Sequence, residues 1–110
     1  MDSLLVFETS QNNEGQTPLH LAAVKGNLEM CRAILEKSVD KSPRSINGNT
    51  PLHFAAKQGH KEVCELFLQY VTEKNPKNNQ GKTPCQLARK NKGKKSKEIV
   101  SLFEMLNVSK

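Results

Sequence analysis

Three histidines and three cysteines are the side chains in this sequence best suited to metal binding or acid–base chemistry. Such chemistry needs a second ligand or a charged partner at a short, regular spacing. His20 and His53 have no histidine, cysteine or carboxylate at ligand spacing, and His60 lies where a helix is expected to begin. We therefore predict structural histidines and no metal site.

The cysteines Cys31, Cys64 and Cys85 are an odd number and include no Cys-x-x-Cys pair. We predict that they are small buried hydrophobic residues. Residues 4–7 are too short an apolar run for a signal-peptide core, which needs about 7–15 residues. No run approaches the roughly 18 residues that span a bilayer. We therefore expect a cytoplasmic or nuclear protein without membrane association.

Motifs for catalysis or nucleotide binding are not found. Neither Gly-x-x-x-x-Gly-Lys-Ser/Thr nor Gly-x-Gly-x-x-Gly occurs, so the glycines do not form a phosphate-binding loop. No serine, cysteine or threonine lies in a nucleophile motif. We expect neither an enzyme nor a cofactor.

A run of positive charge lies near the C-terminal end of a chain whose net charge is +6. Its members are Arg89, Lys90, Lys92, Lys94, Lys95 and Lys97. Such a run can bind an acidic protein surface, an import receptor or nucleic acid. No aromatic residue is interleaved to stack on bases, and a solvated surface is a sufficient explanation. Association through the basic loop 89–97 is the alternative function.

The chain is built from a repeated unit. Gly15, Gly48 and Gly81 lie 33 residues apart, and each precedes a Thr-Pro pair. Threonine can cap a helix and proline is well tolerated at the first helical position, so each pair predicts a helix start. Gly26 and Gly59 predict the ends of the first two of these helices. A second amphipathic helix follows in each unit, and a period of this length predicts units that stack on one another.

These motifs resemble the ankyrin repeat family. The second unit carries its pattern at Gly48, Thr50, Pro51, Leu52, His53, Ala55, Ala56, Gly59, His60, Val63, Leu66, Phe67 and Leu68. The resemblance implies an all-α solenoid of stacked helix-turn-helix units joined by β-hairpin-like loops. It also implies a hydrogen bond from each tetrapeptide histidine to the threonine or nearby backbone.

The sequence departs from the family pattern at several places. Ser38 and Val71 replace the glycine after the second helix, so these helices are expected to end differently or to run on. In the third unit Cys85-Gln86 replaces Leu-His, and a longer loop is expected over residues 91–96. Arg89 and the lysines that follow supply a polar outer face, which predicts a divergent C-terminal cap.

We divide the chain accordingly. Residues 1–14 are an N-terminal segment or the remnant of a preceding repeat, whose apolar residues could cover the end of the first unit. Repeats are expected at 15–47 and 48–80, with the cap at 81–110.

The resemblance implies a concave binding face made by hairpin tips and first helices. Its positions here are Asn13, Glu14, Gln16, Val24, Lys25, Ile46, Asn47, Asn49, Lys57, Gln58, Asn79, Gln80, Lys82, Lys90 and Asn91. Amides and lysines dominate this set, which suits a protein partner with a polar or acidic surface. We therefore expect a monomeric, non-catalytic binding module that acts as an adaptor or as an occluding inhibitor.

Overall fold

The computed structural model describes residues 13–38, 40–71 and 73–108, so the predictions for residues 1–12 lie outside it. The helices of these ranges are α2 (Pro18–Lys25), α3 (Leu28–Lys37), α4 (Pro51–Gln58), α5 (Lys61–Tyr70), α6 (Pro84–Lys90) and α7 (Lys94–Val108). No strand occurs in the described ranges, which confirms the all-α prediction. No helix there is long and apolar enough to cross a membrane.

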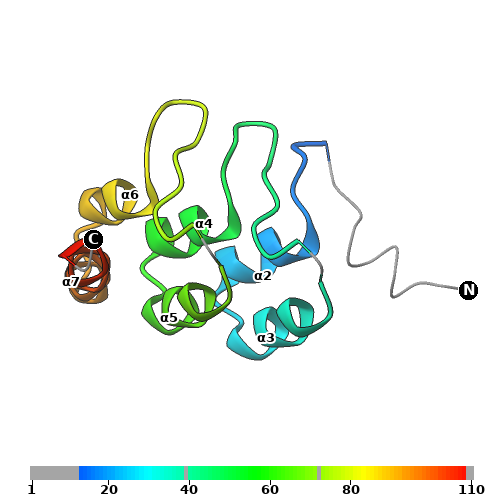
Figure 1. Ribbon diagram of the computed structural model, residues 1–110, viewed down its shortest axis with the longest axis horizontal. Helices are drawn as coiled ribbons and strands as arrows, with labels where there is room; N and C mark the ends of the chain where they lie inside the picture. The colour runs from blue at the N-terminus through cyan, green and yellow to red at the C-terminus, as the bar shows by residue number, and fades with distance from the viewer. Residues whose placement is uncertain (1–12, 39, 72, 109–110) are drawn as a thin grey trace, which may run out of the picture.

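The helices form two rows, with the long loops on one side (Figure 1). The first helices of the units make one row, in which α4 packs against both α2 and α6. The second helices make the other row, in which α5 packs against both α3 and α7. Each unit therefore buries its apolar side against a neighbour, as a repeat of this length requires.

Each first helix begins with a reciprocal cap. The pairs are Thr17 with His20, Thr50 with His53, and Thr83 with Gln86. The threonine N–H donates to histidine Nδ1 over 3.0 Å in the first two pairs and to glutamine Oε1 over 3.1 Å in the third. The threonine side chain accepts the N–H of its partner in return. Gln86, a departure from the repeated motif, thus performs the same capping.

The two capping histidines also join neighbouring units. His20 Nε2 lies 2.8 Å from the carbonyl oxygen of Asn49, and His53 Nε2 lies 2.9 Å from that of Lys82. Because a carbonyl only accepts, Nε2 carries the proton and Nδ1 presents its lone pair to the cap. The predicted structural role of both histidines is confirmed, and it requires the neutral imidazole.

Lysines terminate the second helices, and their role was not predicted. The helices α3 and α5 end at Lys37 and Tyr70. The ammonium of Lys74 donates to the carbonyls of Leu68 and Val71 over 2.6 and 2.7 Å. Lys41, which lies 33 residues earlier, donates to the carbonyls of Leu35 and Ser38. A cation at the negative end of the helix dipole thus replaces the glycine of the family pattern.

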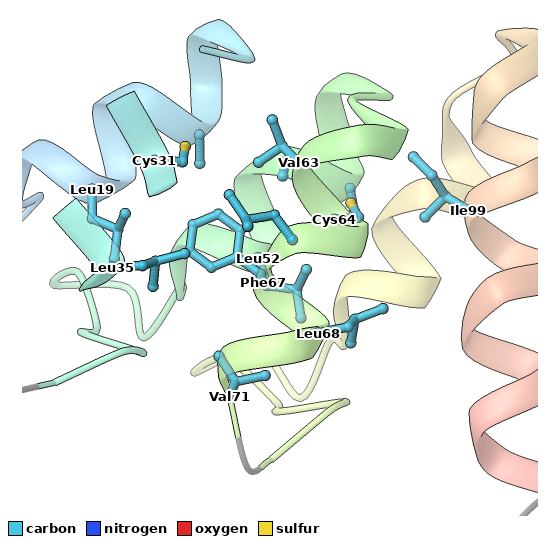
Figure 2. Close-up of a cluster of buried hydrophobic side chains, with 14 of the residues drawn as sticks. Leu19, Cys31, Leu35, Leu52, Val63, Cys64, Phe67, Leu68, Val71 and Ile99 are labelled. Carbon is cyan, nitrogen blue, oxygen red and sulfur yellow. The ribbon is translucent and has the colours of Figure 1, made fainter. Parts of the chain in front are cut away.

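The core is mostly aliphatic and continuous through the three units (Figure 2). Its largest fully buried side chains include Leu19, Leu52, Phe67, Ile99 and Phe103. The three cysteines are also buried and unpaired, which confirms their predicted role. Burial raises the pKa of the Cys31 thiol to about 11 and that of Cys64 to about 12, so both stay protonated at neutral pH.

The loop of the third unit is shorter than predicted. Residues 91–96 were expected to form a loop, but α7 begins at Lys94. The side chain of Asn91 accepts the N–H of Gly93 over 2.8 Å, which closes a tight turn between α6 and α7. Lysines are good helix formers, so the helix starts directly after this turn.

Truncation of a core leucine should destabilise the whole stack. Leu52→Ala removes a side chain that is 1% exposed, and we expect a loss of about 2–5 kcal/mol in the free energy of unfolding. Urea denaturation followed by circular dichroism measures it. Met105→Ala, at a position that is 71% exposed, is the control and should change little. Equal losses in the two variants would contradict this core.

Acid should weaken the stack through its capping histidines. Desolvation by burial lowers the pKa of His20 and His53 below the ordinary value of 6.5 in the folded state. The unfolded chain therefore binds protons more readily, and this stabilisation is complete above about pH 6.5 and is lost as the pH falls below it. We expect a lower urea midpoint at about pH 5 than at about pH 7.5.

A matched variant tests the source of that dependence. His53→Gln should keep the cap, as Gln86 does, while removing one titrating group. We expect lower stability at neutral pH, because the bond to the carbonyl of Lys82 is changed, but a smaller loss on acidification. An unchanged pH dependence would show that other groups cause it.

Candidate functional site

Backbone hydrogen bonds hold the hairpin loops in a row. Ile46 N–H donates to the carbonyl of Glu14 over 2.9 Å, and Asn79 N–H donates to that of Asn47 over 3.0 Å. The two bonds are related by the 33-residue period. The tips of successive hairpins are therefore fixed relative to one another.

Side chains strengthen this row. Asn79 Nδ2 donates to the carbonyl of Ile46 over 3.1 Å, and Asn78 Nδ2 donates to Asn49 Oδ1 over 2.8 Å. Arg44 Nη1 donates to the carbonyl of Lys77, one period away, over 2.7 Å. Asn49 and Asn79, which were predicted to contact a partner, thus also hold the loops together.

The structure exposes most of the predicted partner-binding residues. The exposed ones are Asn13, Glu14, Lys25, Ile46, Asn47, Lys57, Gln58, Asn79, Gln80 and Lys90. The partly buried ones are Gln16, Val24, Asn49, Lys82 and Asn91. Ile46, at the tip of the middle hairpin, is 67% exposed. An apolar side chain held in water by an ordered loop is the most distinctive feature of this set.

Asn91 has a stacking role that the sequence did not reveal. Its Nδ2 donates to the carbonyl of Lys57 over 2.8 Å. His60 does the same one unit earlier, where its Nε2 donates to the carbonyl of Val24 over 2.9 Å. Both bonds join the end of one first helix to the following unit. The amide nitrogen of Asn91 is therefore engaged inside the stack.

Three apolar residues on the same side were missed. Leu21, Phe54 and Leu87 lie 33 residues apart, each on the helix face that also carries the predicted positions three or four residues later. Leu21 is 44% exposed, and Phe54 and Leu87 are partly exposed. Their period and their place directly after His20, His53 and Gln86 are the signals that could have found them.

The charges on this side are mainly positive. Lys25, Lys57, Lys82 and Lys90 stand beside a single carboxylate, Glu14, among the predicted residues. In the part of the chain that the structure describes, none of these four lysines has an ion-pair partner within 4.0 Å. Lys25, Lys57 and Lys90 are exposed, so their charge faces solvent.

The basic run lies at the junction of α6 and α7. Arg89 pairs with Glu104 over 2.9 Å, and Lys95 pairs with Glu62 of α5 over 3.6 Å. Arg89, Lys92 and Lys97 line a surface hollow between the two helices. The first turn of α7 contains no acidic residue. Two members of the run, Arg89 and Lys95, thus form ion pairs with neighbouring side chains at the surface.

No group of three or more histidine, cysteine or acidic side chains is arranged to hold a metal ion in the described ranges. The histidines that sequence reasoning considered for such a role are instead hydrogen-bonded to the backbone of neighbouring units.

Comparison with known proteins agrees with this architecture. Residues 19–68 match the family model described as ankyrin repeats in many copies. A search of curated proteins found no match. Ankyrin repeats generally mediate protein–protein interactions, and the family is typically non-catalytic. The matched segment holds the two most regular helix pairs and is similar to ankyrin repeats, and the third pair continues their stack.

Proposed function

We propose that this protein binds a partner protein through one continuous side of the stack, as an adaptor or as an occluding inhibitor. We call this side the hairpin–helix surface. It comprises the hairpin tips and the exposed positions of α2, α4 and α6: the fifteen predicted residues given above together with Leu21, Phe54 and Leu87. Location in the cytoplasm or nucleus is part of the same proposal.

The observation that carries the proposal is the environment of Ile46. Its side chain is 67% exposed, while its N–H is bonded to Glu14 and its carbonyl to Asn79. Hydrogen bonds to the backbone of Ile46 therefore hold the loop in a conformation that exposes an apolar side chain to water. Apolar side chains that become buried at the centre of an interface are often among the few residues that supply most of its affinity.

The order of the surface supports binding by a preformed site. Backbone and amide hydrogen bonds fix each hairpin tip to the next one. Little conformational freedom is then lost on association, which favours affinity from a modest number of contacts. Lys25, Lys57, Lys82 and Lys90, which form no ion pair with any residue that the structure describes, favour a partner whose surface is acidic.

A double substitution at the exposed isoleucine and at an exposed lysine tests this surface. In Ile46→Arg with Lys57→Glu, the apolar anchor is lost and one positive charge is reversed, so we expect partner capture to fall at least about tenfold. Affinity capture from the source cell with quantitative mass spectrometry measures it. Both residues are exposed, so the melting temperature should fall by no more than a few degrees.

The matched control makes the same two changes elsewhere. Met105→Arg with Lys37→Glu alters an exposed methionine of α7 and an exposed lysine of α3. We expect capture by this variant to equal that of the unmodified protein. If the two double variants lose the same proteins to the same extent, the hairpin–helix surface is not the binding site.

The basic loop 89–97 gives a second candidate function, association with nucleic acid or another acidic surface. It is favoured by the start of α7, where Lys94, Lys95 and Lys97 crowd a helix terminus that is itself positive. Like charges there are unfavourable, and a bound anion would relieve them.

Salt dependence tests this candidate. Binding of a short duplex DNA, followed by fluorescence anisotropy, should weaken steeply as salt is raised because counterions are released on association. Replacing Lys90, Lys92, Lys94 and Lys97 by Ala should abolish it, since the remaining Arg89 and Lys95 are paired with Glu104 and Glu62. Salt-independent binding, or binding that survives in this variant, would exclude the basic loop.

A further inference from the structure

The apolar row on the first helices has a regular spacing. Leu21, Phe54 and Leu87 occupy equivalent positions on α2, α4 and α6, which pack side by side. The axes of packed helices lie about 8–10 Å apart, so the three side chains recur at about that interval. A ligand that contacts all three residues must therefore lie along the direction of the stack.

The row is also ordered. The ring of Phe54 lies edge-on to that of His20, with 5.6 Å between centroids and an interplanar angle of 77°. His20 is itself fixed by its cap and by the carbonyl of Asn49. The middle residue of the row is thus held in place by the same hydrogen bonds that join the units.

A parallel row of positive charge accompanies it. Lys57 and Lys90 follow Phe54 and Leu87 by three residues, and Lys25 follows Leu21 by four. Residues at these spacings are neighbours on a helix surface. Each unit therefore presents one apolar side chain with one lysine beside it, and all three lysines are exposed.

From this pattern we propose that the segment recognised by the hairpin–helix surface is an acidic amphipathic α-helix with an apolar residue at every seventh position. Seven residues of an α-helix rise about 10.5 Å and return almost to the same face, which is close to the interval of about 8–10 Å between units. Carboxylates three or four residues from each apolar residue would meet the lysines. This inference rests on the proposed function and adds the chemistry of the partner.

An extended strand does not match the surface. Its side chains return to one face about every 6.6–6.8 Å, which is out of step with the units. A polyproline helix, at about 9.3 Å per turn, also fits the interval of about 8–10 Å, but it forms no internal hydrogen bonds and leaves its backbone groups unpaired.

The hairpins offer few free N–H groups to such an extended backbone, because several of their own are already paired. Ser45 N–H is bonded to Asn49 and Asn78 N–H to Lys82, in addition to the bonds between neighbouring tips. An α-helix satisfies its backbone internally, so it needs only the apolar and charged contacts that this surface provides.

Synthetic peptides test the proposal with the full chain. The probe is a fluorescein-labelled peptide of about 21 residues with leucine at every seventh position, glutamate three and four residues after each leucine, and alanine elsewhere. One comparison peptide has the same composition in an order that scatters the leucines around the helix. Another carries leucine at every third position between prolines and glutamates. Fluorescence anisotropy gives the dissociation constants.

We expect the heptad peptide to bind at least about tenfold more tightly than either comparison peptide. Phe54→Gln, and separately Leu21→Gln with Leu87→Gln, should remove this preference. Met105→Gln, an exposed apolar position outside the surface, should retain it, and thermal melts monitored by circular dichroism check that every variant is folded. Two variants at different sites keep the test decisive if one of them does not fold.

Three results would overturn the inference: equal affinities for the heptad and scattered peptides, tighter binding of the proline peptide, or no saturable binding. None of these would by itself overturn the proposed function, because the capture of the natural partner is measured separately with the Ile46 and Lys57 double variant. If capture depends on the surface while the heptad preference is missing, the surface binds a protein of another shape.

Discussion

A single hydrogen-bonded relay determines how this stack is built. A threonine caps each of the first two short helices, a histidine returns the cap, and the other nitrogen of that histidine binds a carbonyl in the next hairpin. Local helix formation and contact between units are thereby joined in one buried side chain. Because neighbouring hairpins are positioned by these bonds, the order of the hairpin–helix surface depends on them as well.

The third unit shows that the helix cap can form without the hydrogen bond to a following unit. Gln86 reproduces the local cap but is exposed, whereas His20 and His53 are fully buried between units. Asn91 likewise replaces His60 in binding the carbonyl of the preceding first helix, although the turn before α7 has a different length. The divergent residues of this unit therefore keep the contacts to its neighbour and to its own helix start.

Most of the fold followed from local signals. Thr-Pro pairs and glycines mark helix ends within a few residues, and the period of 33 identifies the stack. The lysine caps of α3 and α5 could not be predicted, because Lys41 and Lys74 reach back six residues to a carbonyl and leave no local pattern. Leu21, Phe54 and Leu87 were missed because family positions, and not the exposed helix face, were used to choose the site. The predicted loop over residues 91–96 was too long, because the side chain of Asn91 closes a tight turn that lets α7 begin at Lys94.

The division of polar groups limits how this protein can recognise a partner. The loops are rich in amides, but the structure commits Asn49, Asn78 and Asn79 to bonds between hairpins. A side chain that holds its neighbour cannot make the same hydrogen bond to a ligand without a cost of about 0.5–1.5 kcal/mol. Affinity must then come mainly from groups that the stack does not use, which are the partly exposed apolar residues and the solvent-facing lysines. A surface of this kind selects partners by the spacing of their apolar residues and by their charge more than by specific hydrogen bonds. Its partners should therefore share a pattern of apolar and acidic residues, without sharing one sequence.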